Sequence, residues 1–312
     1  MIDVFVVFKS VFLLFLMIIP GFLMRKLKLA DGNLAKGFAN TILFVTQPAL
    51  IIVSFIRDFD MQVLYIAAGV LAFSFVAHTM YYIIARRCFK KTTLEMRKVL
   101  QFASIFSNAG YMGIPLIMSI IDSAAGIYAS VYIIGFNVFS WSLGCLIYSE
   151  DKSYISAKKI FINPATIPTY IGLLLFLTPA NRLVPTLLVD ALEMLKLTVA
   201  PMSMMMIGIR LAEAKWKGVL RDVQLIKATV MRLILFPVLL WIIMKGVAMV
   251  GLYSDMTAMT VCLICSATPS ATSAGIFAEK FSGDTAYASK VVSVTTILSL
   301  ITMPLVSLLL KV

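Results

Sequence analysis

Long apolar runs recur along the whole chain and alternate with short polar stretches. A helix needs about 20 predominantly apolar residues to cross the hydrocarbon core of a bilayer. The pattern predicts ten membrane spans, over residues 4–24, 34–55, 63–85, 97–121, 126–148, 164–179, 185–211, 223–247, 257–279 and 286–310. The sixth span is short, and the fourth and ninth contain Gly, Pro and polar residues near their middles. The expected fold class is therefore an all-α polytopic membrane protein.

Composition supports lipid as the main solvent. The chain has 312 residues, of which 61% are hydrophobic and 13% charged, whereas a soluble domain has about 25% charged residues. The first run, 4–24, is expected to be a membrane span because it is too long for a signal peptide and lacks a small-residue cleavage pattern. Cys262 and Cys265 form a CxxC inside an apolar run. Without His or acidic partners nearby, packing explains this pair better than metal or redox chemistry.

The positive charge of the chain is unevenly distributed. The formal net charge is +12, and Lys and Arg gather in the loops that follow odd-numbered spans. The opposite side carries only Lys9, Arg57, Arg182, Lys245 and Lys311. Cytoplasmic loops hold the excess of positive charge, so both termini are expected outside the cell. The basic character thus indicates topology and argues against a nucleic-acid partner.

Weak internal similarity indicates a repeat. Sliding the sequence by 159 residues places 128–130 over 287–289, both Tyr-Ala-Ser, and Pro20 over Pro179. A repeat of five helices is odd-numbered, so its second copy must enter the membrane from the opposite face. We therefore expect two inverted five-helix repeats. The predicted units are a first repeat over 1–148, a cytoplasmic linker over 149–163 and a second repeat over 164–312.

Equivalent spans of the two halves contain helix-breaking residues. Span four carries Asn108, Gly110, Gly113 and Pro115, and span nine carries Pro269 among hydroxyl side chains. Paired Gly/Pro interruptions in matching spans point to the binding site of a transporter. The predicted substrate-binding residues are Asn108, Gly110, Gly113, Pro115, Thr268, Pro269, Ser270, Thr272, Gln47 and Asn137.

The physical reason lies in the backbone. Proline removes an N–H and glycine eases departure from helical geometry. The freed polar groups cannot face lipid, so they must face protein, water or a ligand. A broken helix also presents a half-helix N-terminus, with free N–H donors and partial positive charge, which suits a carboxylate. The alternative, that prolines merely kink helices for packing, fits Pro20, Pro237 and Pro304 better than it fits paired breaks.

The residues at these breaks resemble a known family. The stretch 108–116, Asn-Ala-Gly-Tyr-Met-Gly-Ile-Pro-Leu, is similar to the signature of the auxin efflux carrier family. So are 267–272, 278–284 and 288–299, and the resemblance extends over essentially the whole chain. The short stretch 150–163 resembles bacterial members, because plant members have a long hydrophilic loop there. The resemblance therefore implies a bacterial protein of the inner membrane.

The resemblance implies several further features. Helices four and nine would be broken and would cross at the midplane, with Asn108, Pro115 and Pro269 holding the substrate. Helices 1, 2, 6 and 7 would form a scaffold, and helices 3–5 and 8–10 a transport domain that moves like an elevator. Bacterial relatives are linked to organic acids such as malate or malonate. The resemblance also suggests a homodimer.

Each of the other polar residues inside the predicted spans has two interpretations. His78, the single histidine, is a candidate proton relay or a neutral residue bonded between helices. Arg232 is expected either to attract an anion or to extend to the cytoplasmic surface. Gln47 and Asn137 are expected either to line the substrate path or to bond neighbouring helices. No cofactor or metal site is predicted, and no acidic residue falls at the middle of a span.

The function hypothesis is a secondary transporter of small organic anions, such as carboxylates or auxin-like acids. A sodium-coupled symporter of the bile-acid type is the nearest alternative, with backbone carbonyls at the breaks as candidate sodium ligands. An intramembrane enzyme needs a metal site, an Asp pair or a Ser/His dyad. The chain has no HExxH and no Asp pair at midplane, so it is not expected to be an enzyme.

Overall fold

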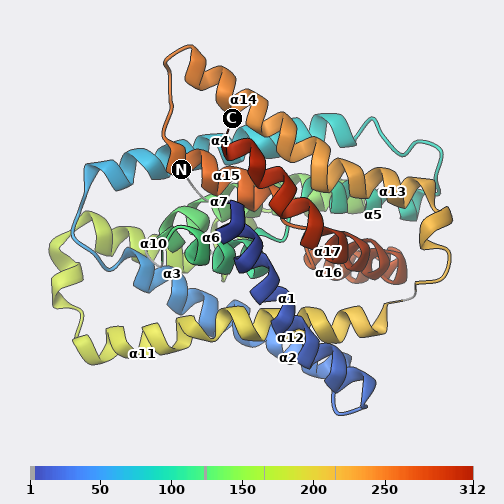
Figure 1. The fold of residues 1–312 in the computed structure, drawn as a ribbon, viewed down its shortest axis with the longest axis horizontal. Helices are drawn as coiled ribbons and strands as arrows, with labels where there is room; N and C mark the ends of the chain where they lie inside the picture. The colour runs from blue at the N-terminus through green and yellow to red at the C-terminus, as the bar shows by residue number, and fades with distance from the viewer. Residues whose placement is uncertain (1–3, 123–124, 165, 215, 312) are drawn as a thin grey trace.

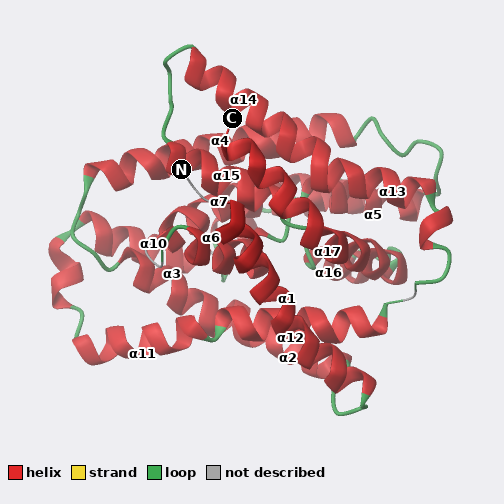
Figure 2. Cartoon of the chain, viewed as in Figure 1, coloured by secondary structure: helices red, strands yellow, loops and turns green. Residues whose placement is uncertain are grey.

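Helices account for nearly all regular structure in the described chain. The computed structural model describes residues 4–122, 125–164, 166–214 and 216–311, and Figure 2 shows helices joined by loops. Within them, the α-helices are α1 (Val4–Lys26), α2 (Gly32–Thr41), α3 (Gln47–Phe55), α4 (Met61–Ala85), α5 (Leu94–Ile105), α6 (Ile114–Ile120), α7 (Gly126–Phe139), α8 (Cys145–Ser149), α9 (Ala157–Phe161), α10 (Thr166–Leu177), α11 (Thr186–Leu197), α12 (Val199–Glu213), α13 (Val223–Val230), α14 (Phe236–Met249), α15 (Met256–Ala267), α16 (Ser273–Lys280) and α17 (Thr285–Ser307). The outermost residues of the two predicted repeats, 1–3 and 312, lie outside the described residues.

Several helices join into longer membrane-length stretches. Within the described residues, seven stretches are long and apolar enough to cross a membrane: Phe5–Lys26, Gly32–Phe55, Met61–Ala85, Gly126–Ser149, Thr186–Glu213, Val223–Met249 and Thr285–Lys311. Shorter apolar helices cover Ala109–Ile120, Thr166–Leu177 and Met256–Ala267. The second of these covers most of the predicted span six, whereas the first and third cover about half of the predicted spans four and nine, whose other halves are α5 and α16. The prediction of an all-α, multi-helix membrane fold is therefore confirmed.

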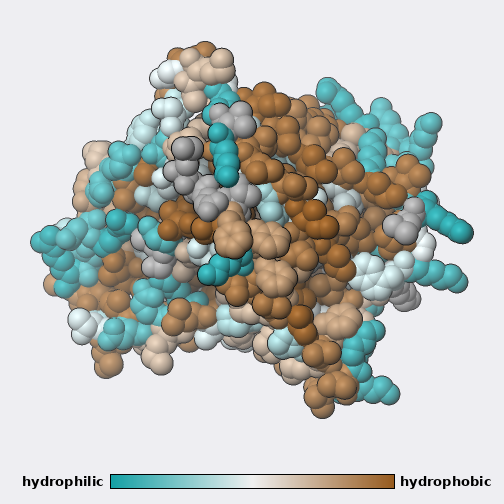
Figure 3. Space-filling model, in the orientation of Figure 1, coloured by the Kyte–Doolittle hydropathy of each residue, from teal (hydrophilic) through white to brown (hydrophobic). Residues whose placement is uncertain are grey.

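Surface polarity agrees with this fold. Figure 3 shows apolar residues over the middle of one face and hydrophilic residues toward its left and right ends. The loops around residues 86–93 and 216–222 lie at the right end in Figure 1, and the loops around 56–60 and 178–185 lie at the left end. Most helices run between these ends, so the apolar band covers their middles.

Three prolines follow turns that are wider than an α-helix. In each case a π-helical turn leads directly into an α-helix whose second residue is proline. These turns are η1 (Ile42–Thr46), η2 (Ala109–Gly113) and η8 (Met231–Leu235). These prolines are Pro48, Pro115 and Pro237. A proline ring clashes with the carbonyl of the preceding turn and offers no N–H. Local π geometry accommodates this defect without ending the helix.

Helices α1 and α12 cross at close range, as Figure 1 shows. Gly21 faces the backbone of Met205, and Gly208 faces the backbone of Ile18 and Phe22. A Cβ atom on Gly208 would lie 2.7 Å from the Phe22 nitrogen, and one on Gly21 would lie 2.7 Å from the Met205 carbonyl carbon. Small residues allow such backbone approach in membranes. The crossing therefore depends on a glycine from each helix.

Gly208→Val is expected to destabilise the protein strongly, because the new side chain meets main-chain atoms that cannot rotate away. Overpacking costs about 3 kcal/mol when backbone must shift, which lowers the melting midpoint by roughly 6–12 °C. Thermal unfolding in detergent measures this effect. Gly246→Val is the matched control, because no atom lies within 4 Å of the site its Cβ would occupy. Equal midpoints for the two variants would show that the crossing tolerates a side chain.

Candidate functional site

A proline causes the interruption in the ninth predicted span. Helix α15 ends at Ala267, and Thr268 has φ −63° and ψ 153°. A residue that precedes proline is pushed out of the α region by the Pro Cδ atom, so Pro269 fixes the end of α15. The chain becomes helical again at Ser273, where α16 begins. The break thus spans the residues 268–272.

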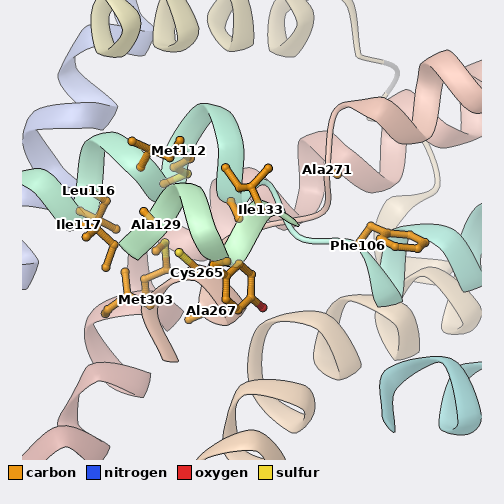
Figure 4. Packing of buried hydrophobic residues seen from close by; sticks show 14 of the residues in the cluster. Phe106, Met112, Leu116, Ile117, Ala129, Ile133, Cys265, Ala267, Ala271 and Met303 are labelled. Atoms are coloured by element: carbon orange, nitrogen blue, oxygen red, sulfur yellow. The ribbon is translucent and has the colours of Figure 1, made fainter. Parts of the chain in front are cut away.

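The first interruption is held by contact with the second. Helix α5 ends at Ile105, Phe106 is extended with φ −96° and ψ 118°, and η2 begins at Ala109. The Asn108 N–H donates to the Pro269 carbonyl at 2.7 Å, and the Ala271 N–H donates to the Phe106 carbonyl at 2.9 Å. These bonds form an antiparallel bridge, which joins the two breaks. Figure 4 shows Phe106 and Ala271 on the two joined segments, with the buried apolar cluster around Met112, Leu116 and Ile117 to one side of them.

A cavity of about 670 Å³ opens beside this bridge. Its wall combines residues from α2, η1, α3 and α12 with residues from η2, α7, η4 (Ser140–Gly144) and α16. The volume lies in the range of small-molecule sites. Ile133, Phe136 and Trp141 supply apolar surface, whereas the breaks supply polar groups. The cavity is therefore suited to a small molecule with one polar end.

Several polar atoms at the breaks have free hydrogen-bonding capacity. Asn108 is 4% exposed and Ser107 is 1% exposed. The Asn108 Nδ2, Ser107 Oγ and Ser273 Oγ atoms have no hydrogen-bond partner within the described chain. All three residues line the cavity. Unpaired buried donors cost free energy unless a ligand or water satisfies them, so these atoms mark a place for a ligand.

The structure divides the predicted substrate residues into two groups. Five of them line the cavity: Gln47, Asn108, Gly110, Asn137 and Thr272. The others are absent from its wall and belong to the breaks or the adjoining helix: Gly113, Pro115, Thr268, Pro269 and Ser270. Ser270, for example, donates through Oγ to the Ala103 carbonyl at 2.8 Å. A Cβ on Gly110 would lie 3.4 Å from the Gln47 amide nitrogen, so these two residues face one another.

His78 is fully buried away from the cavity wall. Its Nδ1 lies 2.7 Å from the Ser74 carbonyl, so Nδ1 carries the hydrogen and donates it. Its Nε2 has no partner within the described residues. Five aromatic rings surround the imidazole: Tyr81, Phe106, Tyr132, Phe136 and Phe139. These surroundings favour a neutral ring packed between α4 and α7.

Arg232 lies on η8 and is fully buried, so it does not extend to the surface. It is also absent from the cavity wall. Its Nη1 donates to the carbonyls of Ser104 at 3.1 Å and Ile105 at 2.8 Å, and its Nη2 donates to the carbonyl of Ser266. The guanidinium therefore contacts the main chain where α5 and α15 end.

Sequence reasoning missed part of the cavity wall. Ser107 and Ser273 adjoin predicted residues, so their position beside the breaks was the available signal. Charged residues also line the cavity: Lys36, Arg210, Glu279 and Lys280. Their pattern along the chain indicated only topology. No group of three or more His, Cys, Asp or Glu residues suited to a metal occurs among the described residues.

A multi-span helical membrane protein with interrupted helices beside a polar-ended cavity has the build of a membrane transporter. Family comparison leads to the same class, because residues 6–307 match the family described as membrane transport protein. The chain belongs to this family, the auxin efflux carriers, and is a multi-pass membrane transporter. Membership confirms the predicted family and agrees with a protein that is not an enzyme. Comparison with curated proteins gave no match.

Proposed function

We propose that this protein is a secondary transporter of small organic anions, with carboxylates as the substrate class. The observation that carries the proposal is the Asn108 amide, buried at the cavity wall with an unpaired Nδ2 donor. Ser107 and Ser273 add hydroxyl donors beside it. An acceptor-only group such as a carboxylate satisfies several donors at once.

The helix beyond Asn108 strengthens this choice of substrate. η2 and α6 form one helical stretch, Ala109–Ile120, whose first backbone N–H groups have no acceptor within the helix. A helix N-terminus also carries partial positive charge. Gly110 and Tyr111, in its first turn, line the cavity. In this proposal the carboxylate lies between the Asn108 side chain and this N-terminus, with the apolar part of the substrate toward Ile133 and Phe136.

Paired helix contacts support the inverted-repeat arrangement. In the 159-residue alignment, α1 corresponds to α10, and α12 corresponds to the span that contains α3. α1 packs on α12, and α10 packs on α3. Likewise α4 packs on α15, and α13 packs on α5. Such reciprocal pairs are expected from two copies related by a two-fold axis in the membrane plane. The two breaks would then meet on this axis, at the midplane.

The position of the cavity supports an elevator movement. One wall belongs to the proposed scaffold, through Gln47 and Arg210, and the other to the proposed transport domain, through Asn108, Asn137 and Thr272. The α1–α12 crossing joins parts of the scaffold tightly. Asn108 and both breaks belong to the transport domain, so they would move together with the bound anion. Alternating access in transporters built from repeats is largely a rigid-body movement of one bundle against the other.

Transport assays on purified protein in liposomes test this function. Charge movement is recorded on adding a panel of mono- and dicarboxylates, including malate and malonate, with and without sodium and a pH gradient. A saturable response to a carboxylate, absent from protein-free liposomes, is the expected result. A response that requires sodium would favour a symporter of the bile-acid type. Silence across the panel in folded protein would remove the organic-anion assignment.

Cationic residues at the cavity are expected to raise the local concentration of anions. Lys36, Arg210 and Lys280 line it together with Glu279. The double variant Lys36→Gln/Lys280→Gln is expected to raise KM by about three- to tenfold at low ionic strength, with little change in kcat. This difference shrinks at high salt, because the Debye length falls to about 3 Å at 1 M. Initial uptake rates at two salt concentrations measure it.

Lys245→Gln is the matched control for charge removal, because Lys245 packs over Trp241 on α14 and is absent from the cavity wall. Its KM is expected to stay within about twofold of wild type. If the double variant and this control show the same KM and salt dependence, the cavity cations do not guide the substrate.

A further inference from the structure

Arg232 contacts both half-helices that end at the breaks. The Ser104 and Ile105 carbonyls, its partners at 3.1 and 2.8 Å, are in the last turn of α5. The Ser266 carbonyl, its third partner, is in the last turn of α15. The Ser266 hydroxyl oxygen is a fourth partner, 3.5 Å from Nη2. One guanidinium therefore satisfies carbonyls from two helices that are far apart in sequence.

Both partners are negative ends of helix dipoles. The last carbonyls of a helix lack intrahelical partners, and a helix C-terminus acts as about half a negative charge. Two such ends therefore amount to about one negative charge in a buried place. Arg232 has no ion pair with a carboxylate in the described part of the chain. Its positive charge is balanced by the two helix ends.

Carbonyl and hydroxyl oxygens are also the ligands of hard metal cations. In transporters with broken helices, unwound carbonyls and half-helix C-termini hold the coupling sodium or proton. The Arg232 partners are of this kind, three carbonyls and one hydroxyl. A metal ion and the guanidinium would compete for the same oxygens.

Aromatic residues hold the guanidinium in this position. Its carbon lies 5.3 Å from the ring centre of Tyr81 and 6.0 Å from that of Phe236. The rings of Tyr81 and Phe236 stack with their centres 4.4 Å apart. The Tyr81 hydroxyl lies 2.6 Å from the Ser266 Oγ. Cation–π contact is strongest where water is excluded. The side chain is therefore enclosed between rings and carbonyls.

We propose that Arg232 is a built-in cation that occupies the position of a coupling metal ion at the crossing, so that the carrier moves its anion without sodium. This inference rests on the proposed function for its consequence in transport, whereas the occupancy of the cation position is independent of any substrate. Removing the guanidinium would expose three carbonyls and create a site for a small metal cation.

Thermal unfolding without substrate tests the occupancy directly. Wild-type melting midpoints are compared in NaCl, KCl, LiCl and choline chloride at equal ionic strength. Because Arg232 fills the position, the midpoints are expected to agree within about 1 °C. A saturable, sodium-specific rise in wild type would overturn the proposal, since it would show a metal site that Arg232 does not occupy.

Arg232→Ala tests the same position by removing the built-in cation. In choline chloride its midpoint is expected to fall on the order of 10 °C, because both helix ends lose their counter-charge. Saturating NaCl, or a low concentration of guanidinium ion, is expected to restore about 5 °C. The control Lys196→Ala removes another buried cation, one paired with Glu193 at 2.9 Å, and is expected to gain no cation-specific stability. Equal midpoints of Arg232→Ala in all salts would overturn the proposal.

Arg232→Lys keeps the test decisive if the alanine variant does not fold. Its ammonium still places a positive charge near the carbonyls, so it is expected to melt below wild type but equally in sodium and choline. A sodium-specific rise in this variant would contradict the proposal. Transport by wild type is then measured with sodium replaced by choline, and an unchanged initial rate is expected. If no carboxylate is transported, the proposed function fails while the melting results still decide the cation position.

Discussion

Asn108→Ala is expected to reduce carboxylate transport at least about a hundredfold while leaving the fold intact. The side chain contributes a buried donor at the cavity wall without a partner in the described protein, and its backbone bond to Pro269 survives the substitution. A hydrogen bond to a charged group is worth about 1.5–3 kcal/mol, and loss of orientation beside the helix N-terminus adds to this. Charge movement in liposomes, with melting as a check on folding, measures the change.

Asn108→Asp separates charge from size at the same position. The aspartate keeps the shape but replaces the amide donor by negative charge, so it is expected to transport no better than Asn108→Ala. Asn181→Ala is the control, because Asn181 lies in the short 3-10 turn η6 (Pro179–Leu183), donates to the Arg57 carbonyl and is absent from the cavity wall. The control is expected to lose less than about threefold in rate. Full transport by Asn108→Ala would move the substrate site elsewhere.

Apolar run length predicted the helices well, because lipid imposes one requirement on every span. The predicted span 63–85 is α4, Met61–Ala85, and the predicted span 164–179 contains α10, Thr166–Leu177. A spanning segment must satisfy all its backbone groups internally, so helix type and length follow from hydropathy alone. Ends differ by a few residues where polar caps extend a helix. Thr93, for example, starts α5 by accepting a bond from the Met96 N–H.

The two breaks differ in how far the sequence determines them. Pro269 ends α15 by a local clash, so its break could be predicted from the residue itself. Pro115 instead lies at the second position of α6, after the wide turn η2, where proline is tolerated. The break at 106–108 precedes both η2 and Pro115. It lies where Ser107 pairs with Ser270 from the other half of the protein. Such a tertiary cause leaves no local signal.

Arg232 shows the same limit for a side chain. Its place inside an apolar run was evident, and both readings from the sequence invoked its charge, either toward an anion or toward the surface. Its partners are main-chain carbonyls 34, 127 and 128 residues away. A main-chain carbonyl carries no residue identity, so no pattern in the sequence marks it as a ligand. The folded arrangement alone brings the two helix ends to one cation.

A reversible cross-link between α1 and α6 is expected to stop transport completely. Ser10 on α1 and Ser119 on α6 join the proposed scaffold to the proposed transport domain, and their Oγ atoms are 2.9 Å apart. Ser10→Cys/Ser119→Cys, in a background without native cysteines, places two sulfurs where a disulfide can form. Oxidation is expected to abolish carboxylate transport and reduction to restore it, because an elevator cannot move against its scaffold when the two are joined.

Each single variant, Ser10→Cys or Ser119→Cys, serves as a control and is expected to be insensitive to the oxidant. The fraction cross-linked is measured by mass spectrometry and compared with the fraction of activity lost, and the two should be equal. Full activity in fully cross-linked protein would mean that α1 and α6 keep their relative position throughout the cycle. The substrate would then have to pass by local gating at the breaks, so α6 would belong with the scaffold. A loss of activity in proportion to the cross-linked fraction would instead show that α6 moves relative to α1. The boundary between scaffold and transport domain would then lie between these two helices, with Asn108 on the moving side.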